Sequence, residues 1–169
     1  YSFGWEIEAP VIEMAHYMPW LKSRFESLGG TIETRKVSSF DELGSELIVN
    51  CSGLGAREIC QDEEVIPVRG QVVYIRQDPG FGRYVQRPES LIYTIPRRDV
   101  TVLGGTAQKG DWTMEIREED EEEILEKCES LWPGLDRSKI VGRAVGLRPS
   151  RTEVRLERES LNGKKIIHN

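Results

Sequence analysis

Apolar side chains near the amino end of the chain recur at helical spacing. We predict a helix that opens at Pro10, which suits a first helical turn, and that restarts or kinks at Pro19. Gly29-Gly30 is predicted to end this helix, because glycine accepts the left-handed conformation of a helix terminus. The apolar positions that share one side are Met18, Leu21, Phe25 and Leu28.

A second amphipathic helix is predicted for residues 115 to 131, and Trp132-Pro133-Gly134 is predicted to end it. The carboxylates of this stretch would face water, so we interpret the acidic run as a solvated face that carries no chemistry. The apolar residues that can share the opposite side are Ile116, Ile124, Leu125, Cys128 and Leu131.

Strand-like segments account for most of the remaining chain. Residues 47 to 51 form an apolar run without alternation, which fits a strand buried on both faces. After residue 68, short strands separated by Gly, Pro and Asp indicate an antiparallel sheet. Together the elements predict an α+β or mixed α/β fold. The other predicted strands are residues 31–37, 71–76, 91–95, 100–103, 139–147, 153–156 and 164–168.

Composition and charge narrow the functional classes. The 169 residues suffice for one domain or two small lobes, and 38% hydrophobic with 31% charged residues is typical of a soluble globular protein. No apolar stretch approaches the ~18 residues of a membrane span, and a net charge of −6 disfavours nucleic acid. The two histidines are not part of an HExxH motif, so we predict no metal site. The three cysteines are an odd number without CxxC spacing, which favours reduced thiols inside a cell over disulfides.

The turn after the apolar run at residues 47 to 51 is a candidate cofactor contact. Its small residues, Ser52-Gly53-Leu54-Gly55, precede a helix that we expect to begin at Ala56. A strand, a small-residue turn and a helix bring backbone close to a phosphate or a ring. The turn is not a dinucleotide fingerprint, because Glu58 stands at the third glycine position. An ordinary βα turn is the alternative.

Several segments, in order, resemble the D-amino-acid oxidase family. They are Val49-Asn50-Cys51-Ser52-Gly53, Arg69-Gly70-Gln71-Val72, Leu103-Gly104-Gly105-Thr106-Ala107-Gln108-Lys109-Gly110-Asp111-Trp112, Val145-Gly146-Leu147-Arg148-Pro149-Ser150-Arg151 and Ile167-His168-Asn169. The family's enzymes are longer. They begin with a GxGxxG turn that holds the FAD pyrophosphate, and a Gly-rich loop follows their IHN segment. Neither is in this sequence, so we expect a fragment whose two ends are both cut.

The resemblance implies an enzyme that moves hydride from the Cα of a D-amino acid to FAD. The imino acid then hydrolyses to a 2-oxo acid and ammonia, and O2 reoxidises the flavin to give hydrogen peroxide. No catalytic base or nucleophile is required. Arg148 matches the arginine that binds the substrate carboxylate, for which its planar fork is suited. Tyr93 matches the tyrosine that helps to bind it. A surface ion pair and a packed strand tyrosine are the alternatives for these two residues.

The resemblance also implies the cofactor contacts and the domain organisation. Cys51, Ser52 and Gly53 match positions that touch FAD, and Val37 matches a residue beside the adenine, with a core valine as the alternative. The implied architecture is a partial, Rossmann-like FAD-binding domain and a substrate domain made of an antiparallel sheet and the acidic helix. Residues 1–68 and 142–169 would form the first, and residues 69–141 the second.

The substrate preference is predicted to lean towards D-aspartate and D-glutamate, with neutral D-amino acids kept open. The segments around Gly104-Gly105-Thr106 and Arg148 look more like those of aspartate-type enzymes. A second cation would then bind the side-chain carboxylate. Arg87 is the first candidate and Arg83 the second, with a solvated loop charge as the alternative for both. Two departures from the family pattern are Ala107, where aspartate-type enzymes have arginine, and Glu89, where the neutral branch has a tyrosine.

Two other functional classes stay open at this stage. One is a truncated relative that has lost FAD and serves as a binding or dimerising module. The other is a flavoprotein that oxidises glycine or N-methyl amino acids, which would lack the Gly-Leu-Arg-Pro and Gly-Asp-Trp combination. For the enzyme, the expected partners are a small D-amino acid and O2, with a homo-oligomer as a further possibility. The expected location is intracellular, in the peroxisome or the cytoplasm.

Overall fold

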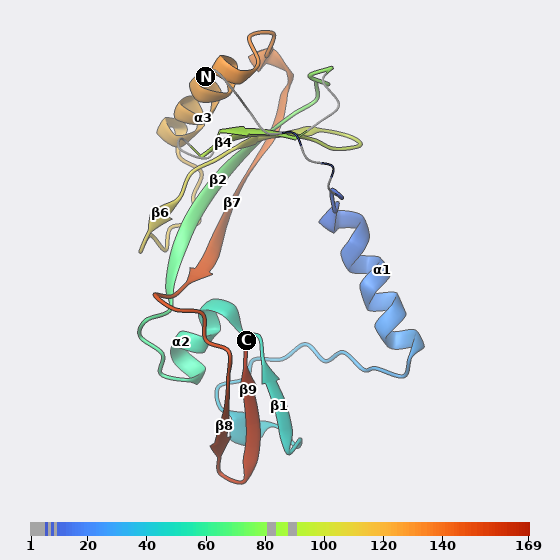
Figure 1. Cartoon of the computed structure of the whole chain (residues 1–169), viewed down its shortest axis with the longest axis vertical. Coiled ribbons are helices and arrows are strands. Elements are labelled where there is room, and N and C mark those ends of the chain that lie inside the picture. The colour runs from blue at the N-terminus through green and yellow to red at the C-terminus, as the bar shows by residue number, and fades with distance from the viewer. Residues whose placement is uncertain (1–5, 7, 9, 81–83, 88–90) are drawn as a thin grey trace. The chain divides into compact units, whose positions relative to one another are not determined.

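The computed structural model describes residues 6, 8, 10–80, 84–87 and 91–169. The chain divides into two compact units, Tyr1–Lys36 and Val37–Asn169. The fold is of the predicted mixed α/β class and contains two sheets, both in the second unit (Figure 1). The predicted domain bounds at residues 68 and 141 stay a prediction.

The first unit contains helix α1, Met14–Ser27. The helix begins four residues after Pro10, because the Glu13 carbonyl accepts its first hydrogen bonds, from the backbone of His16 and Tyr17, at 2.9 Å each. It runs across Pro19 without restarting. The predicted end is confirmed: Gly29 has φ +86° and donates to the Glu26 carbonyl. The strand predicted at residues 31–37 is wrong, since no described segment pairs with this stretch to complete its backbone hydrogen bonds.

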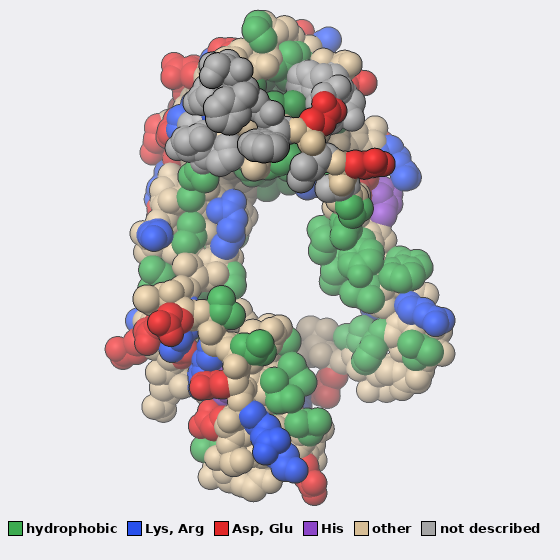
Figure 2. All heavy atoms as spheres, viewed as in Figure 1, with side chains coloured by type: hydrophobic (Ala, Val, Ile, Leu, Met, Phe, Trp, Pro, Cys, Tyr) green, Lys and Arg blue, Asp and Glu red, His purple; other side chains and the backbone are tan. Residues whose placement is uncertain are grey.

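Helix α1 buries none of its own residues among those described. Its hydrophobic side chains gather into a patch on the face of the molecule that Figure 2 shows. Tyr17 and Trp20 stack within it, with ring centroids 5.7 Å apart. The predicted amphipathic side therefore exists, but none of the described residues of its own unit covers it. Its exposed members are Met14, Tyr17, Met18, Trp20, Leu21 and Phe25.

A six-stranded sheet dominates the second unit, in the order β3-β4-β5-β2-β6, with β7 also paired to β2. All its pairs are antiparallel, as predicted. The β2–β7 pair forms the long ribbon of Figure 1. The strands are β2 Ile66–Ile75, β3 Val85–Arg87, β4 Ile92–Pro96, β5 Thr101–Gly104, β6 Gln108–Lys109 and β7 Ile140–Ser150. The predicted strands at residues 71–76, 91–95, 100–103 and 139–147 are confirmed with shifted ends.

Helix α3, Glu118–Leu131, covers one face of this sheet. It begins later than predicted because the Gln71 side chain binds both the N–H and the carbonyl of Arg117 at its N-cap. Ile116 therefore lies before the helix and is 44% exposed, which corrects its predicted place on the apolar side. The core under α3 contains Val73, Ile75, Ile92, Leu103, Ile124, Leu125, Cys128 and Trp132. A 3-10 turn, η4 Arg137–Lys139, leads into β7.

A smaller sheet has the order β1-β9-β8, with strands β1 Leu47–Asn50, β8 Glu157–Leu161 and β9 Lys164–His168. Strands β1 and β9 are parallel. Phe40, Ile48 and Ile166 form its core. The 3-10 turn η1 Phe40–Glu42 precedes the sheet, and η2 Gly53–Gly55 and helix α2 Ala56–Ile59 follow β1. The predicted start of α2 at Ala56 and the predicted strand at residues 164–168 are confirmed.

Two predictions for the smaller sheet are wrong. Leu47 and Val49 are each 58% exposed, so β1 is buried on one face and not on both. Residues 153 to 156 form no strand, and β8 begins at Glu157 instead. The reason is the tight turn at Asn162-Gly163, where both residues have positive φ. Such a turn fixes the hairpin register, and β8 pairs only where β9 lies opposite it.

Within the described part of the chain, no helix is long and apolar enough to cross a membrane. The same residues contain no group of three or more His, Cys, Asp or Glu side chains placed to bind a metal ion.

Candidate active site

Strand β2 separates the two faces of the large sheet by its alternation. Its odd-numbered residues from 67 to 75 are buried, and Val73 and Ile75 pack against the core under α3. Its even-numbered residues face the other way. We call this second side of the sheet the open face. A hollow of about 290 Å³ lies on it, lined by Gly70, Val72, Tyr74, Ala144, Val145, Gly146, Leu147 and Arg148.

Tyr93 lies on the open face. In register it lies opposite Gly104, which in turn lies opposite Val72, and opposed residues of antiparallel strands share a face. The phenol ring covers the Gly104-Gly105 backbone. A Cβ built on Gly104 would lie 2.2 Å from Tyr93 Cζ, and one built on Gly105 would lie 2.8 Å from the hydroxyl. Both glycines are therefore needed for the observed position of the ring.

Arg148 lies on the same open face, on β7 opposite Val68. Its guanidinium lies over Gly70, where a Cβ would lie 2.5 Å from Nη2 and 2.8 Å from Cζ. Nη1 donates to the Thr106 carbonyl over 3.4 Å. The structure thus brings together the two residues that the sequence proposed as a carboxylate site.

Electrostatics link these two residues. Burial raises the pKa of the Tyr93 hydroxyl, and the positive charge of Arg148 offsets part of that rise. The phenol is therefore protonated at neutral pH and can donate a hydrogen bond. A charged guanidinium and a neutral hydroxyl donor on one face suit the binding of a carboxylate.

A buried polar network lies behind Thr106, and the sequence did not single it out. Thr106 Oγ1 accepts from the Gln71 backbone at 2.9 Å and donates to Gln108 Oε1 at 3.2 Å. Arg69 Nη1 donates to Gln108 Oε1 at 2.9 Å and to Asp120 Oδ2 at 2.5 Å. Asp120 is only 5% exposed, so the prediction of a wholly solvated acidic run is wrong for this residue. The sequence signal that could have found this network is that Arg69, Gln71 and Gln108 all lie in segments that resemble the family.

Arg87 lies on the other face from Tyr93. Its register partner is Ile92, which belongs to the core under α3, whereas Gln86 lies opposite Tyr93. The Tyr84 hydroxyl donates to Gln86, and the Tyr84 and Tyr93 ring centroids are 6.3 Å apart. The structure thus does not bring Arg87 to the side of Tyr93 and Arg148. The second candidate cation, Arg83, and Glu89, which stands where the neutral branch has a tyrosine, lie outside the described residues.

The predicted cofactor turn lies at the carboxyl ends of two parallel strands. Asn50 of β1 and His168 of β9 are register partners at this edge, where open α/β sheets bind their ligands. Cys51 and Ser52 are exposed, and Gly53 has φ +57°. The exposed small residues and the left-handed glycine fit the close approach of an FAD molecule. Val37 is half-exposed, three residues before the core residue Phe40.

Buried side chains fix this turn from beneath. Asn50 Oδ1 accepts from the Ser52 backbone at 3.2 Å, and Asn50 Nδ2 donates to His168 Nδ1 at 3.2 Å. The proton of His168 is thereby assigned to Nε2, which donates to Glu159 Oε2 at 2.9 Å. Asn50 and His168 are both buried. The turn is therefore held in one conformation before any ligand binds.

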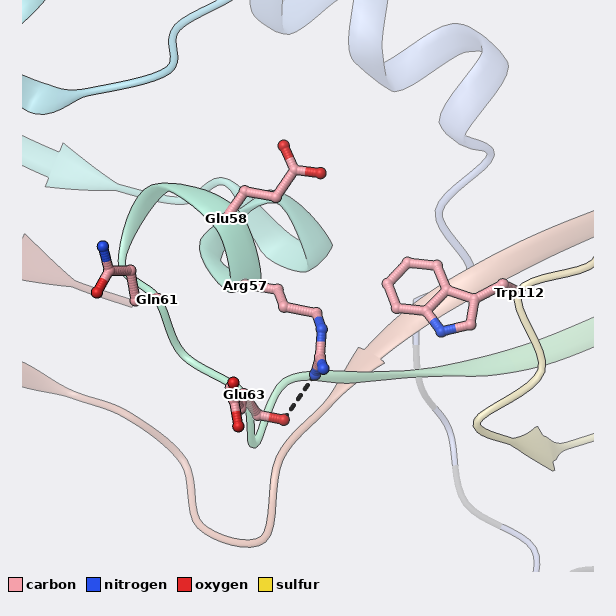
Figure 3. Close-up of a pocket in the computed structure, with 5 residues that line it drawn as sticks. All are labelled: Arg57, Glu58, Gln61, Glu63 and Trp112. Atoms are coloured by element: carbon pink, nitrogen blue, oxygen red, sulfur yellow. Dashed lines mark hydrogen bonds between the residues drawn. The ribbon is translucent and has the colours of Figure 1, made fainter.

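A larger hollow of about 500 Å³ lies elsewhere, lined by Arg57, Glu58, Gln61, Glu63 and Trp112 (Figure 3). Arg57 donates to the Glu63 carbonyl at 2.7 Å, and Figure 3 shows its guanidinium turned towards that carbonyl. No residue of the proposed carboxylate or cofactor sites lines this hollow. Its size alone does not make it the active site, because the residues that suit a carboxylate lie on the open face.

Comparison with known proteins identifies the family. The model of the family "FAD dependent oxidoreductase" matches residues 4–169. The chain belongs to this family. It is 42% identical over 172 residues to a D-amino-acid oxidase of Rubrobacter xylanophilus, covering 98% of this chain and 52% of that protein. It is 39% identical over 163 residues to human D-aspartate oxidase, covering 95% of this chain and 48% of that protein.

The predicted resemblance and the predicted cofactor of the family, FAD, are thus confirmed. The chain spans about half the length of the curated relatives it matches. Among solved structures, it is similar in fold to glycine oxidase from Geobacillus kaustophilus, with a TM-score of 0.64 and 20% identity. That similarity covers 73% of this chain and 36% of the glycine oxidase chain.

Proposed function

We propose that the protein oxidises D-amino acids in an FAD-dependent reaction, with a preference for D-aspartate and D-glutamate. The observation that carries the proposal is the presence of Arg148 and Tyr93 on one open face of the large sheet, beside a hollow. The family membership of the chain supports it. When bound, FAD supplies the acceptor for the hydride that leaves the substrate Cα.

The residues of this chain bind and orient the substrate. Arg148 forms charge-assisted hydrogen bonds to the α-carboxylate. Tyr93 donates a hydrogen bond from its hydroxyl to the same group, and its raised pKa keeps the hydroxyl protonated at neutral pH. The ring is fixed over Gly104-Gly105, so the hydroxyl has a defined position. Cys51, Ser52 and Gly53, at the carboxyl edge of β1, would hold FAD, and Val37 would lie on the side of its adenine.

The acidic preference rests on the motif resemblance and requires a second cation near the substrate. Arg97 is the candidate that the geometry favours over Arg87. Arg97 directly follows β4 and lies four residues after Tyr93, so the alternation of the strand puts both on the same side. Its positive charge lowers the pKa of Tyr93. Arg87 lies on the face of Ile92 instead. Loss of D-aspartate preference in Arg97→Ala but not in Arg87→Ala would support this choice, and the reverse would restore Arg87.

The test is hydrogen peroxide release from D-aspartate and D-alanine, with added FAD, by this chain and by the full-length product of its gene. Arg148→Ala is expected to raise the KM of the active form about 10- to 100-fold, the loss of a hydrogen bond to a charged group. Arg143→Ala is the matched control, because Arg143 lies on the same strand but pairs with Glu121 at 2.6 Å.

Three outcomes contradict the proposal. No peroxide and no flavin spectrum in either protein would indicate the alternative, a non-enzymatic relative that acts as a binding or dimerising module. Equal KM values for Arg148→Ala and the parent would remove Arg148 from the substrate site. A preference for D-alanine over D-aspartate would replace the acidic substrate class with the neutral one.

A further inference from the structure

Arg148 is a long side chain on the open face, and its guanidinium contacts backbone rather than a carboxylate among the described residues. It lies over Gly70 and donates to the carbonyl of Thr106. An arginine with four side-chain torsions loses rotamer freedom when it binds a ligand. Any contact that fixes its position beforehand therefore lowers the cost of substrate binding.

Thr106 is itself fixed by its side chain. It is 8% exposed, and its hydroxyl makes two hydrogen bonds, one from the Gln71 backbone and one to Gln108 Oε1. These bonds tie the segment after β5 to strand β2, the strand on which Gly70 lies. The carbonyl of Thr106 and the backbone of Gly70 thus contact the Arg148 guanidinium from two sides.

The network extends into the core under α3. Gln108 Nε2 donates to Asp120 Oδ1 at 2.6 Å, and Arg69, which is fully buried, binds both Gln108 and Asp120. Arg69 also donates to the carbonyls of Thr113 and Glu115. Each donor of this network has an acceptor, so Gln108 is held in the orientation that accepts from Thr106.

We propose that Thr106 is a positioning residue for Arg148: its hydroxyl, held by Gln71 and Gln108, aims its own carbonyl at the guanidinium. Thr106 acts through Arg148 and does not touch the substrate. The inference rests on the proposed carboxylate-binding role of Arg148. It adds a residue on which substrate affinity depends and connects the buried ion pair of Arg69 and Asp120 to that affinity.

The test uses Thr106→Val, which keeps the shape of the side chain and removes the hydroxyl, and Thr106→Ser, which restores the hydroxyl. In the full-length protein, Thr106→Val is expected to raise KM about three- to tenfold, the value of one or two neutral hydrogen bonds, with kcat within about twofold of the parent. Thr106→Ser is expected to return KM to within about twofold of the parent.

Thr101→Val is the matched control for loss of stability. Thr101 is also a buried threonine, at the other end of β5, and its hydroxyl donates to the Gln77 carbonyl at 2.7 Å rather than to the groups around Arg148. It should lower the free energy of unfolding as Thr106→Val does and leave KM unchanged. Titration with succinate, a dicarboxylate without an oxidisable amine, followed by calorimetry, reports affinity without turnover.

The outcomes separate this inference from the function on which it rests. If Arg148→Ala weakens succinate binding and raises KM while Thr106→Val changes neither, Thr106 does not position Arg148. If Thr106→Ser fails to restore KM, or Thr101→Val raises KM equally, the effect is general destabilisation and the inference is wrong. If Arg148→Ala itself changes neither quantity, the proposed carboxylate site fails and the positioning role fails with it.

Discussion

At the scale of single residues, the site depends on what lies behind the sheet as well as on it. Cys128 of α3 lies behind Tyr93. It is fully buried, and its thiol donates weakly to the carbonyls of Tyr93, at 3.6 Å, and Gly104, at 3.9 Å. Burial raises the pKa of the Cys128 thiol from 9.0 to about 11. A thiol with this pKa is an inert core residue, because the thiolate is the reactive form.

From the raised pKa of Cys128 we predict that the free energy of unfolding falls at alkaline pH. Because the native thiol holds its proton more tightly than the unfolded one, its contribution is complete below pH 9.0 and is lost as the pH rises to about 11. The difference of about two pH units corresponds to about 3 kcal/mol. Urea titrations at about pH 8 and about pH 10.5, one below the unfolded pKa and one near the folded pKa, measure the free energy of unfolding. We expect it to fall less between these two pH values in Cys128→Ala than in the parent. Parallel losses in both proteins would contradict this assignment.

At the scale of elements, the buried pair of Arg69 and Asp120 joins α3 to β2. The two side chains are almost fully buried and lie 2.5 Å apart. Removing one member of a buried ion pair leaves the other charge without compensation in a medium that solvates it poorly. The attachment of α3 to the sheet therefore depends on the carboxylate of Asp120, which the sequence does not distinguish from its solvated acidic neighbours.

Asp120→Ala is accordingly expected to lower the free energy of unfolding by about 3–5 kcal/mol. Glu123→Ala is the matched control on the same helix, because Glu123 is exposed and, among the residues that the structure describes, its ion-pair partner is Lys127 one turn later. Such a pair contributes about 0.5 kcal/mol or less. Chemical denaturation of both variants checks the difference. Equal losses would show that the buried pair does not anchor the helix.

Most elements were predictable from the sequence, because their apolar periodicity and their Gly and Pro signals are local. Strand register was not. A shift of one residue moves a side chain to the other face of a sheet, so proximity of Arg87 to Tyr93 in sequence could not show that Arg87 lies opposite Ile92. The burial of Asp120 was equally hidden, since its partner Arg69 is far away in the chain.

The candidate site was predicted in part for a similar reason. Arg148 and Tyr93 were found through motif resemblance, and register then brought them to one face. Thr106 was missed because its role depends on its own backbone carbonyl, on the backbone N–H of Gln71 and on the side chains of Gln108 and Arg148, which come from three different strands. Hydrogen bonds of that kind leave no spacing pattern in a single sequence.

At the scale of the whole second unit, the proposed cofactor turn and the proposed substrate site belong to different sheets but meet at one point. A Cβ built on Gly53, in the turn after β1, would lie 3.7 Å from Pro149 Cγ. Pro149 directly follows Arg148 on β7. The contact places the residues proposed to touch FAD next to the strand that carries Arg148, the arginine proposed to bind the substrate carboxylate. Hydride transfer from the substrate to FAD would require the two binding sites to be adjacent.

Gly53→Ala tests this junction. The position has φ +57°, which costs a residue with a Cβ about 1–2 kcal/mol, so the turn is expected to change conformation and FAD affinity to fall about 5- to 30-fold. Fluorescence titration of FAD with the full-length protein measures the affinity. Alkylation of the exposed Cys51 thiol gives a second readout, since FAD should slow it in the parent and less in the variant. Gly44→Ala is the control, because Gly44 has no positive φ and open space where its Cβ would lie. Unchanged FAD affinity in Gly53→Ala would mean that the turn after β1 does not contact the flavin.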